Sequence, residues 1–105
     1  MELKVFTLPT CTICPTAKRI ALEVAHKYNV AFRVVDMSTK EGLEEGLTYR
    51  IMSTPSIALG DDVVSRGRLV PKEMLEEEVE QRIRKWKARI SYQETNYSQA
   101  LSSVE

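Results

Sequence analysis

The stretch Cys11-Thr12-Ile13-Cys14-Pro15 lies between two segments with different apolar periodicity. The segment before it, residues 3–8, is a short apolar run bounded by a proline, as expected of a buried strand. In the segment after it, apolar residues recur at the i, i+3, i+4, i+7 spacing of an amphipathic helix. These residues are Ala17, Ile20, Ala21, Val24, Ala25 and Tyr28. The two cysteines are therefore predicted where a first strand passes into a first helix.

A second strand and a second helix are predicted next. Residues 30–35 form an apolar run that closes at Asp36. The order strand, helix, strand implies a parallel pair with a right-handed crossover. Ser38 and Glu41 have the spacing of a capping box, in which Ser38 accepts from the amide of residue 41 and Glu41 accepts from the Ser38 amide. We therefore expect a helix to begin there.

This second helix has apolar residues at four-residue spacing, Leu43, Leu47 and Ile51. It also contains Gly42 and Gly46, each of which costs about 1 kcal/mol relative to alanine in a helix interior. We expect a helix that is short or loosely held, with the three apolar residues as its stripe.

A hairpin and a final helix complete the chain. Residues 56–59 and 63–65 are apolar runs, and the turn residues 60–62 between them predict an antiparallel hairpin. Pro71 suits the first turn of a helix. The apolar stripe of this helix consists of Leu75, Val79, Ile83, Trp86 and Ile90.

The charges of the final helix are arranged along its length. Glutamates fill its first half and cations its second half, which complements the helix dipole. The spacing also allows ion pairs between Glu78 and Arg82 and between Glu80 and Arg84. We interpret this charge run as a solvated helix face rather than a binding patch.

The predicted order of elements is βαβαββα, an α/β fold in which a four-stranded mixed sheet is flanked by three helices. A chain of 105 residues fits one domain. We expect residues 1–90 to form this domain and residues 91–105 to be a C-terminal tail or a helix extension.

Charge and cysteine content narrow the classes of partner and compartment. The 15 basic and 15 acidic residues give a net charge of zero, so we expect neither a nucleic acid nor a membrane as partner. No run approaches the roughly 18 apolar residues of a membrane span. Both cysteines lie within four residues, too short a loop to hold together a secreted mini-protein. We expect a cytoplasmic monomer.

A Cys-x-x-Cys pair at a helix start suits thiol–disulfide chemistry. One helical turn brings the two side chains onto one face, and the unpaired amides and positive dipole end stabilise a thiolate on the first cysteine. Cys11 is therefore predicted as the nucleophile and Cys14 as the resolving thiol. We expect no metal and no cofactor other than the redox-active disulfide itself.

Zinc sites use the same Cys-x-x-Cys spacing, so a second class of function stays open. Two cysteines cannot close a tetrahedral sulfur site within one chain. In this alternative the protein is a non-catalytic binding module, with the pair structural or shared with a metal across a dimer.

Two motifs at this separation resemble a known family. Cys11-Thr12-Ile13-Cys14-Pro15 follows the first strand, residues 51–56 with Thr54-Pro55 precede the hairpin, and Gly67 precedes Pro71. Residues 2–85 are similar to small archaeal-type thioredoxin and glutaredoxin-like proteins. The resemblance implies the thioredoxin fold and the reduction of protein disulfides through a mixed-disulfide intermediate, with a thioredoxin-reductase-like protein as electron donor.

The resemblance also implies a substrate site. It places a cis-proline, Pro55, beside the dithiol and leaves the backbone of Thr54 free to pair with an extended substrate. Thr12 and Ile13 lie between the cysteines, where side chains face outward, and an exposed isoleucine could bind apolar protein surface.

The sequence departs from larger family members at several positions. Val5 stands where larger thioredoxins carry a buried aspartate, six residues before the first cysteine. Glutathione-using glutaredoxins usually carry a Gly-Gly followed by acidic residues after the hairpin, whereas this chain has Gly67-Arg68. Asp61 and Asp62 keep a glutathione-linked glutaredoxin as a further alternative.

Other chemistry-bearing residues are interpreted as structural. His26 lies roughly 18 Å along the helix from Cys14, so we expect an ordinary surface histidine. Asp36 is interpreted as a capping or solvated carboxylate. Met37, Met52 and Met74 are predicted to serve packing.

Overall fold

The computed structural model describes the backbone of residues 1–104 and the side chains of residues 1–89. The predicted order βαβαββα is confirmed. Its elements are β1 (Glu2–Thr7), α1 (Cys14–Lys27), β2 (Ala31–Asp36), α2 (Lys40–Thr48), β3 (Ser56–Leu59), β4 (Asp62–Ser65) and α3 (Lys72–Val104).

The four strands form a mixed sheet in the order β2-β1-β3-β4. β1 pairs in parallel with β2, where Val5 lies opposite Val34. On its other side β1 pairs antiparallel with β3, where Val5 lies opposite Ile57. β3 and β4 form the predicted antiparallel hairpin. β1 is therefore an inner strand, and its apolar residues Leu3, Val5 and Phe6 are fully buried.

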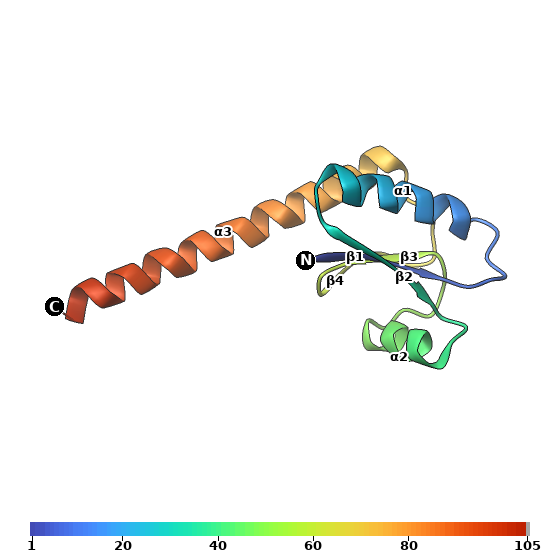
Figure 1. Cartoon of the computed structure of the whole chain (residues 1–105), viewed down its shortest axis with the longest axis horizontal. Helices are drawn as coiled ribbons and strands as arrows, with labels where there is room; N and C mark the ends of the chain where they lie inside the picture. Colours follow the sequence, from blue (N-terminus) through green and yellow to red (C-terminus); the bar gives the residue numbers. More distant parts are fainter. Residues whose placement is uncertain (105) are drawn as a thin grey trace.

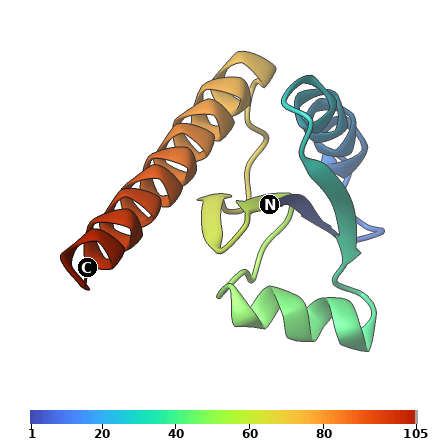
Figure 2. The same cartoon turned by 60° about the vertical axis from the view of Figure 1, so that its left-hand side comes forward.

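Helices cover both faces of the sheet. α1 and the first half of α3 lie over one face and α2 lies over the other (Figures 1 and 2). Because strand side chains alternate between faces, Leu3 and Val5 enter the core with α1 and α3. Phe6 enters a second cluster with Met37 and Ile51. The sheet thus has a hydrophobic core on each side.

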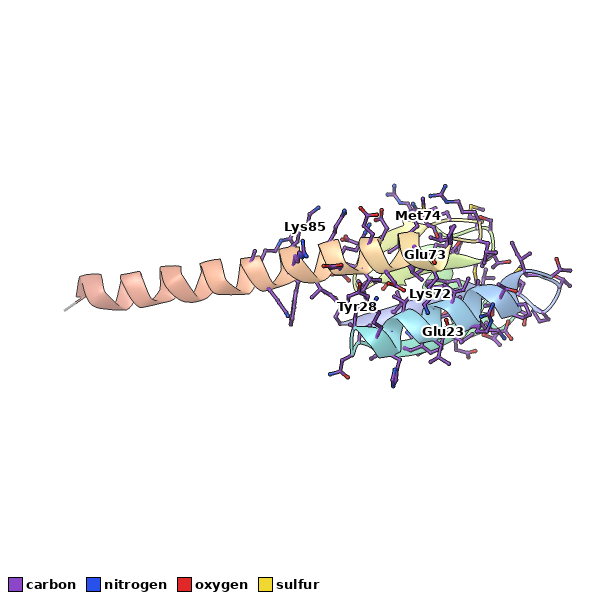
Figure 3. All side chains as sticks on the ribbon, turned by 90° about the horizontal axis from the view of Figure 1, so that it is seen from above. Glu23, Tyr28, Lys72, Glu73, Met74 and Lys85 are labelled. Atoms are coloured by element: carbon purple, nitrogen blue, oxygen red, sulfur yellow. A yellow bond between two sulfur atoms is a disulfide. The ribbon has the colours of Figure 1, made fainter. Side chains whose placement is uncertain are left out.

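Polar contacts join α1 to α3. Lys72 of α3 lies 3.2 Å from Glu23 of α1, and Figure 3 shows these two side chains side by side. The Lys27 ammonium donates to Glu76 at 2.6 Å, and this hydrogen bond raises the pKa of Lys27. These contacts are exposed, so each contributes little to stability. The two helices meet mainly through the apolar residues of the core cluster, which include Val24 of α1 and Leu75 of α3.

The start of α2 differs from the predicted capping box. Asp36 Oδ1 accepts hydrogen bonds from both the Ser38 amide, at 2.9 Å, and the Ser38 hydroxyl, at 2.7 Å. Since Ser38 is held in this way, Thr39 is the N-cap residue, and its Oγ1 accepts from the Gly42 amide at 3.0 Å. The helix therefore begins one residue later than the sequence predicts, and the prediction of Ser38 as its cap is wrong.

The predicted apolar stripe of α2 is wrong for Leu43 and Leu47, while Ile51 is buried but follows the end of the helix. Leu43 and Leu47 are 45% and 51% exposed, whereas Gly42 and Gly46 are buried. A Cβ at Gly42 would overlap the carbonyl of Asp36. The glycines thus let α2 lie close to the end of β2, and the leucines face outward because the close approach uses the opposite side of the helix.

α3 keeps only part of its predicted stripe in the core. Leu75 and Val79 are fully buried, and Ile83 packs partly against the same cluster. Trp86 is 47% exposed, and the later turns of α3 extend beyond the sheet (Figure 1). Ile90 lies outside the described side chains. The predicted ion pairs Glu78–Arg82 and Glu80–Arg84 are both present.

The three methionines do not share one environment. Met37 is buried, as predicted, and packs beneath α2. Met52 is 85% exposed in the loop before β3, and Met74 is 48% exposed in the first turn of α3. The packing prediction is wrong for Met52 and Met74, since neither position faces the sheet.

The close approach of α2 predicts an asymmetric response to alanine. Gly42→Ala should lower the free energy of unfolding by about 1–3 kcal/mol, the usual cost of overpacking, because its Cβ meets backbone that cannot turn away. Gly46→Ala is the matched control. Its Cβ meets the flexible end of Met37 at 2.7 Å, and the gain in helix propensity of about 1 kcal/mol offsets that contact. Urea unfolding measures both; a Gly46→Ala loss as large as that of Gly42→Ala would contradict the assignment.

Candidate active site

Two loops lie at the same end of the sheet, one after β1 and one before β3. β1 ends at Thr7 and leads to the cysteines, while β3 begins at Ser56, directly opposite Phe6. The Thr54-Pro55 peptide bond immediately before β3 is cis. The register thus brings the Cys-x-x-Cys loop and the Thr54-Pro55 segment to one edge, as the resemblance implies.

Cys11 and Cys14 form a disulfide, with their Cα atoms 5.4 Å apart. Cys14 is the first residue of α1 and is only 2% exposed. Cys11 precedes the helix and is half-buried. Its amide donates to the carbonyl of Leu8 at 3.1 Å, which closes the loop after β1. Of the two sulfur-bearing residues, Cys11 is the more accessible to a substrate.

The N-terminus of α1 is built to favour negative charge. Ile13 is the N-cap residue and provides no side-chain hydrogen bond to the free amides. The first turn contains Pro15 and no acidic side chain. The unpaired amides and the positive end of the helix dipole therefore act on the cysteines without a competing carboxylate in that turn. Such an environment favours the thiolate form of a reduced cysteine at a helix start.

A hollow of about 260 Å³ lies beside the disulfide. Its lining consists of Thr7, Leu8, Pro9, Cys11, Cys14, Pro15, Lys18 and Asp36. Sequence reasoning did not assign Lys18 or Asp36 to this site. Two signals were available: Lys18 follows Cys14 by one helical turn, and the carboxyl ends of parallel β1 and β2 share one edge.

Asp36 carries a negative charge beside the cysteines. The Ser38 hydroxyl and amide donate to its carboxylate, and these hydrogen bonds lower the pKa of Asp36, with a smaller contribution from the Lys18 charge. Asp36 does not cap α2, whose N-cap residue is Thr39. Its place beside the cysteines was not foreseen from the sequence.

The other predicted residues differ in exposure and in their place relative to the disulfide. Thr12 and Ile13 are exposed, Ile13 by 42%. Pro55 is buried, Thr54 is half-buried, and neither lines the hollow beside the disulfide. His26 is exposed near the far end of α1, as predicted.

Asp61 and Asp62, which kept glutathione use open, line a different hollow of about 840 Å³. That hollow lies between α2 and the β3–β4 hairpin, and neither cysteine lines it. Within the described residues, no group of three or more His, Cys, Asp or Glu side chains could hold a metal ion. The structure therefore brings neither aspartate to the dithiol.

A disulfide-bonded Cys-x-x-Cys at the first helix of this βαβαββα fold defines a thiol–disulfide oxidoreductase. The sequence matches the thioredoxin domain family over residues 1–80. It is 36% identical over 90 residues to a probable thioredoxin of Archaeoglobus fulgidus, covering 86% of this chain and 93% of the relative. It is 34% identical over 83 residues to a thioredoxin of Methanocaldococcus jannaschii, covering 79% and 96%. The chain belongs to the thioredoxin family.

Solved structures confirm the fold. Thioredoxin 1 from Thermosipho africanus superimposes with a TM-score of 0.67 at 13% identity, covering 83% of this chain and 99% of that one. A malarial protein gives a TM-score of 0.60 at 15% identity, covering 76% and 93%. The family match ends at residue 80, whereas α3 continues to Val104.

The hydrogen bonds to Asp36 predict a measurable titration. In Ser38→Ala the hydroxyl donor is lost, so the pKa of Asp36 should rise toward the ordinary value of 3.8. A group with a depressed folded-state pKa stabilises the fold above its unfolded pKa and loses that contribution as the pH falls. Carboxyl carbon NMR shifts between pH 2 and 6 measure the change. Thr48→Ala, which removes another exposed α2-region hydroxyl, should leave Asp36 unaffected, and an equal shift in both variants would contradict the assignment.

Proposed function

We propose that this oxidoreductase acts as a reductase of protein disulfides, with Cys11 attacking and Cys14 resolving. The observation that carries this assignment of roles is the difference in exposure, since Cys11 is half-buried and Cys14 is 2% exposed. A bulky protein disulfide can approach only the outer sulfur. The inner one then reacts within the chain.

The reaction balances in two exchanges. The Cys11 thiolate attacks one sulfur of the substrate disulfide, a Cys11–substrate bond forms, and the other substrate sulfur leaves as a thiolate that takes up a proton. Cys14, after losing its proton, attacks Cys11 Sγ. The second substrate sulfur leaves and is protonated, so two electrons pass to the substrate and the Cys11–Cys14 disulfide forms.

The Thr54-Pro55 segment is proposed to hold the substrate strand. No backbone hydrogen bond of Thr54 is found among the described residues, while the Pro55 carbonyl accepts from the Arg68 amide at 3.1 Å. Ser56 Oγ donates to the Ser53 carbonyl at 2.7 Å and accepts from the Gly67 amide at 3.1 Å. The segment is thus anchored on both sides of Thr54, whose own backbone groups stay available to an extended substrate.

A thioredoxin-reductase-like protein is proposed to return the electrons, and the protein is proposed to work as a cytoplasmic monomer. The 34–36% identity to archaeal thioredoxins supports this setting. No helix in the described part of the chain has the length and apolar character needed to cross a bilayer.

Cysteine variants test the two roles. Wild-type protein should accelerate the reduction of insulin by dithiothreitol, followed as turbidity, and Cys11→Ser should reduce the acceleration to background. Cys14→Ser should instead accumulate a mixed disulfide with insulin, visible by mass spectrometry without reductant, because the resolving thiol is missing. A wild-type protein that gives no acceleration would remove the support for a general reductase. Trapping by Cys11→Ser instead would reverse the assigned roles.

Ile13 is proposed to contribute apolar contact to the substrate. Ile13→Ser should raise KM for insulin about three- to tenfold, roughly the loss of one partly buried apolar side chain, and leave kcat nearly unchanged. Leu22→Ser is the matched control, because Leu22 is 52% exposed on the same helix and lies about 12 Å further along it from Cys14. Equal changes in KM for the two variants would rule out a specific role for Ile13.

A further inference from the structure

We propose that Lys18 keeps the reduced dithiol in its reactive thiolate form and that Asp36 limits this effect, so that the two side chains together set its reactivity. The inference deepens the proposed function by naming residues that regulate the same site. It rests on the hollow beside the disulfide, which Cys11, Cys14, Lys18 and Asp36 all line.

The helix geometry places Lys18 beside the sulfurs. Lys18 follows Cys14 by four residues, so both lie on one face of α1. Helical side chains lean toward the N-terminus of their helix, which directs the Lys18 side chain toward the turn that holds Cys14. Lys18 is half-buried and reaches the lining of the hollow. Its ammonium is therefore a positive charge at the place where a thiolate develops.

Asp36 approaches the same hollow from the end of β2. Its position is fixed by Ser38, which donates two hydrogen bonds to the carboxylate, at 2.7 and 2.9 Å. These bonds and the nearby Lys18 charge lower the pKa of Asp36, so the carboxylate is ionised at neutral pH. A fixed negative charge disfavours a thiolate nearby. Lys18 and Asp36 thus act on the dithiol with opposite sign.

The side chains that face the dithiol from the surrounding elements are few. Among the described residues that line the hollow, Lys18 from α1 and Asp36 from β2 are the charged ones. The loop after β1 contributes Leu8 and Pro9. Neither α3 nor the segment before β3 adds a charged side chain to this lining. The positive end of the α1 dipole also acts on the thiolate, and it is the same in every variant of Lys18 and Asp36.

The test measures the thiolate directly in the reduced full-length chain. The rate of alkylation of Cys11 by iodoacetamide is followed from pH 4 to 9 at low salt, since only the thiolate reacts. Lys18→Met should move the midpoint to higher pH and slow alkylation at pH 7 about three- to tenfold, the effect of losing one nearby charge. Lys18→Arg should restore the wild-type midpoint because the positive charge returns. Asp36→Asn should move the midpoint to lower pH.

Controls separate electrostatics from structure. Lys85→Met removes an exposed lysine from the projecting part of α3 (Figure 3) and should leave the midpoint unchanged. Salt at about 1 M should shrink the difference between wild type and Lys18→Met, because it screens charges beyond about 3 Å. A variant that has lost its fold would not show this dependence on salt. Lys18→Gln provides a second variant without the positive charge.

Three results would overturn the proposal. An unchanged midpoint in both Lys18→Met and Lys18→Gln would show that Lys18 has no effect on the thiolate. Alkylation of Lys18→Arg as slow as that of Lys18→Met would exclude the charge of Lys18 as the cause. An unchanged midpoint in Asp36→Asn would show that the Asp36 charge does not act on the thiolate. Alkylation requires no protein substrate, so failure here is distinguishable from failure of insulin reduction.

Discussion

The pairing of β1 on both of its edges is the constraint on which the site depends. β1 is parallel to β2 and antiparallel to β3, so three chain segments meet at one end of the sheet. The loop after β1 holds the cysteines, the end of β2 carries Asp36, and the start of β3 follows Pro55. Because the inner strand is buried on both faces, its register cannot slip without moving the core. Strand pairing therefore positions the backbone of these segments, while Ser38 orients the Asp36 carboxylate.

α2 acts on the same edge from beneath the sheet. The Asp36 carbonyl accepts from the Thr39 amide at 3.2 Å and from the Thr39 hydroxyl at 2.8 Å. Gly42 lies directly against that carbonyl. The close approach that turns Leu43 and Leu47 outward thus also fixes where β2 ends. α2, whose two glycines lower its helix propensity, thus helps to place the Asp36 carboxylate beside the dithiol.

Sequence periodicity was sufficient to predict the strands and α1, although Val34 of β2 is 41% exposed. It failed in α2, because the stripe rule takes the largest apolar residues as the buried ones, whereas here Gly42 and Gly46 face inward. In α3 the predicted apolar stripe extends beyond the core, since a helical pattern continues whether or not a sheet lies beneath it, and Trp86 is 47% exposed. Within the site, the cysteines follow from local spacing. Lys18 and Asp36 become neighbours of the sulfurs only through strand pairing.

α3 extends away from the end of the molecule that holds the cysteines. The protein extends 62 Å along its longest axis, with the loop that contains Cys11 at one end and the last turns of α3 at the other (Figure 1). A reporter dye or a surface linker attached near Val104 would therefore stand clear of an approaching protein substrate. α3 behaves as a built-in spacer, so the chain could be immobilised by that end with its reacting sulfurs facing solution.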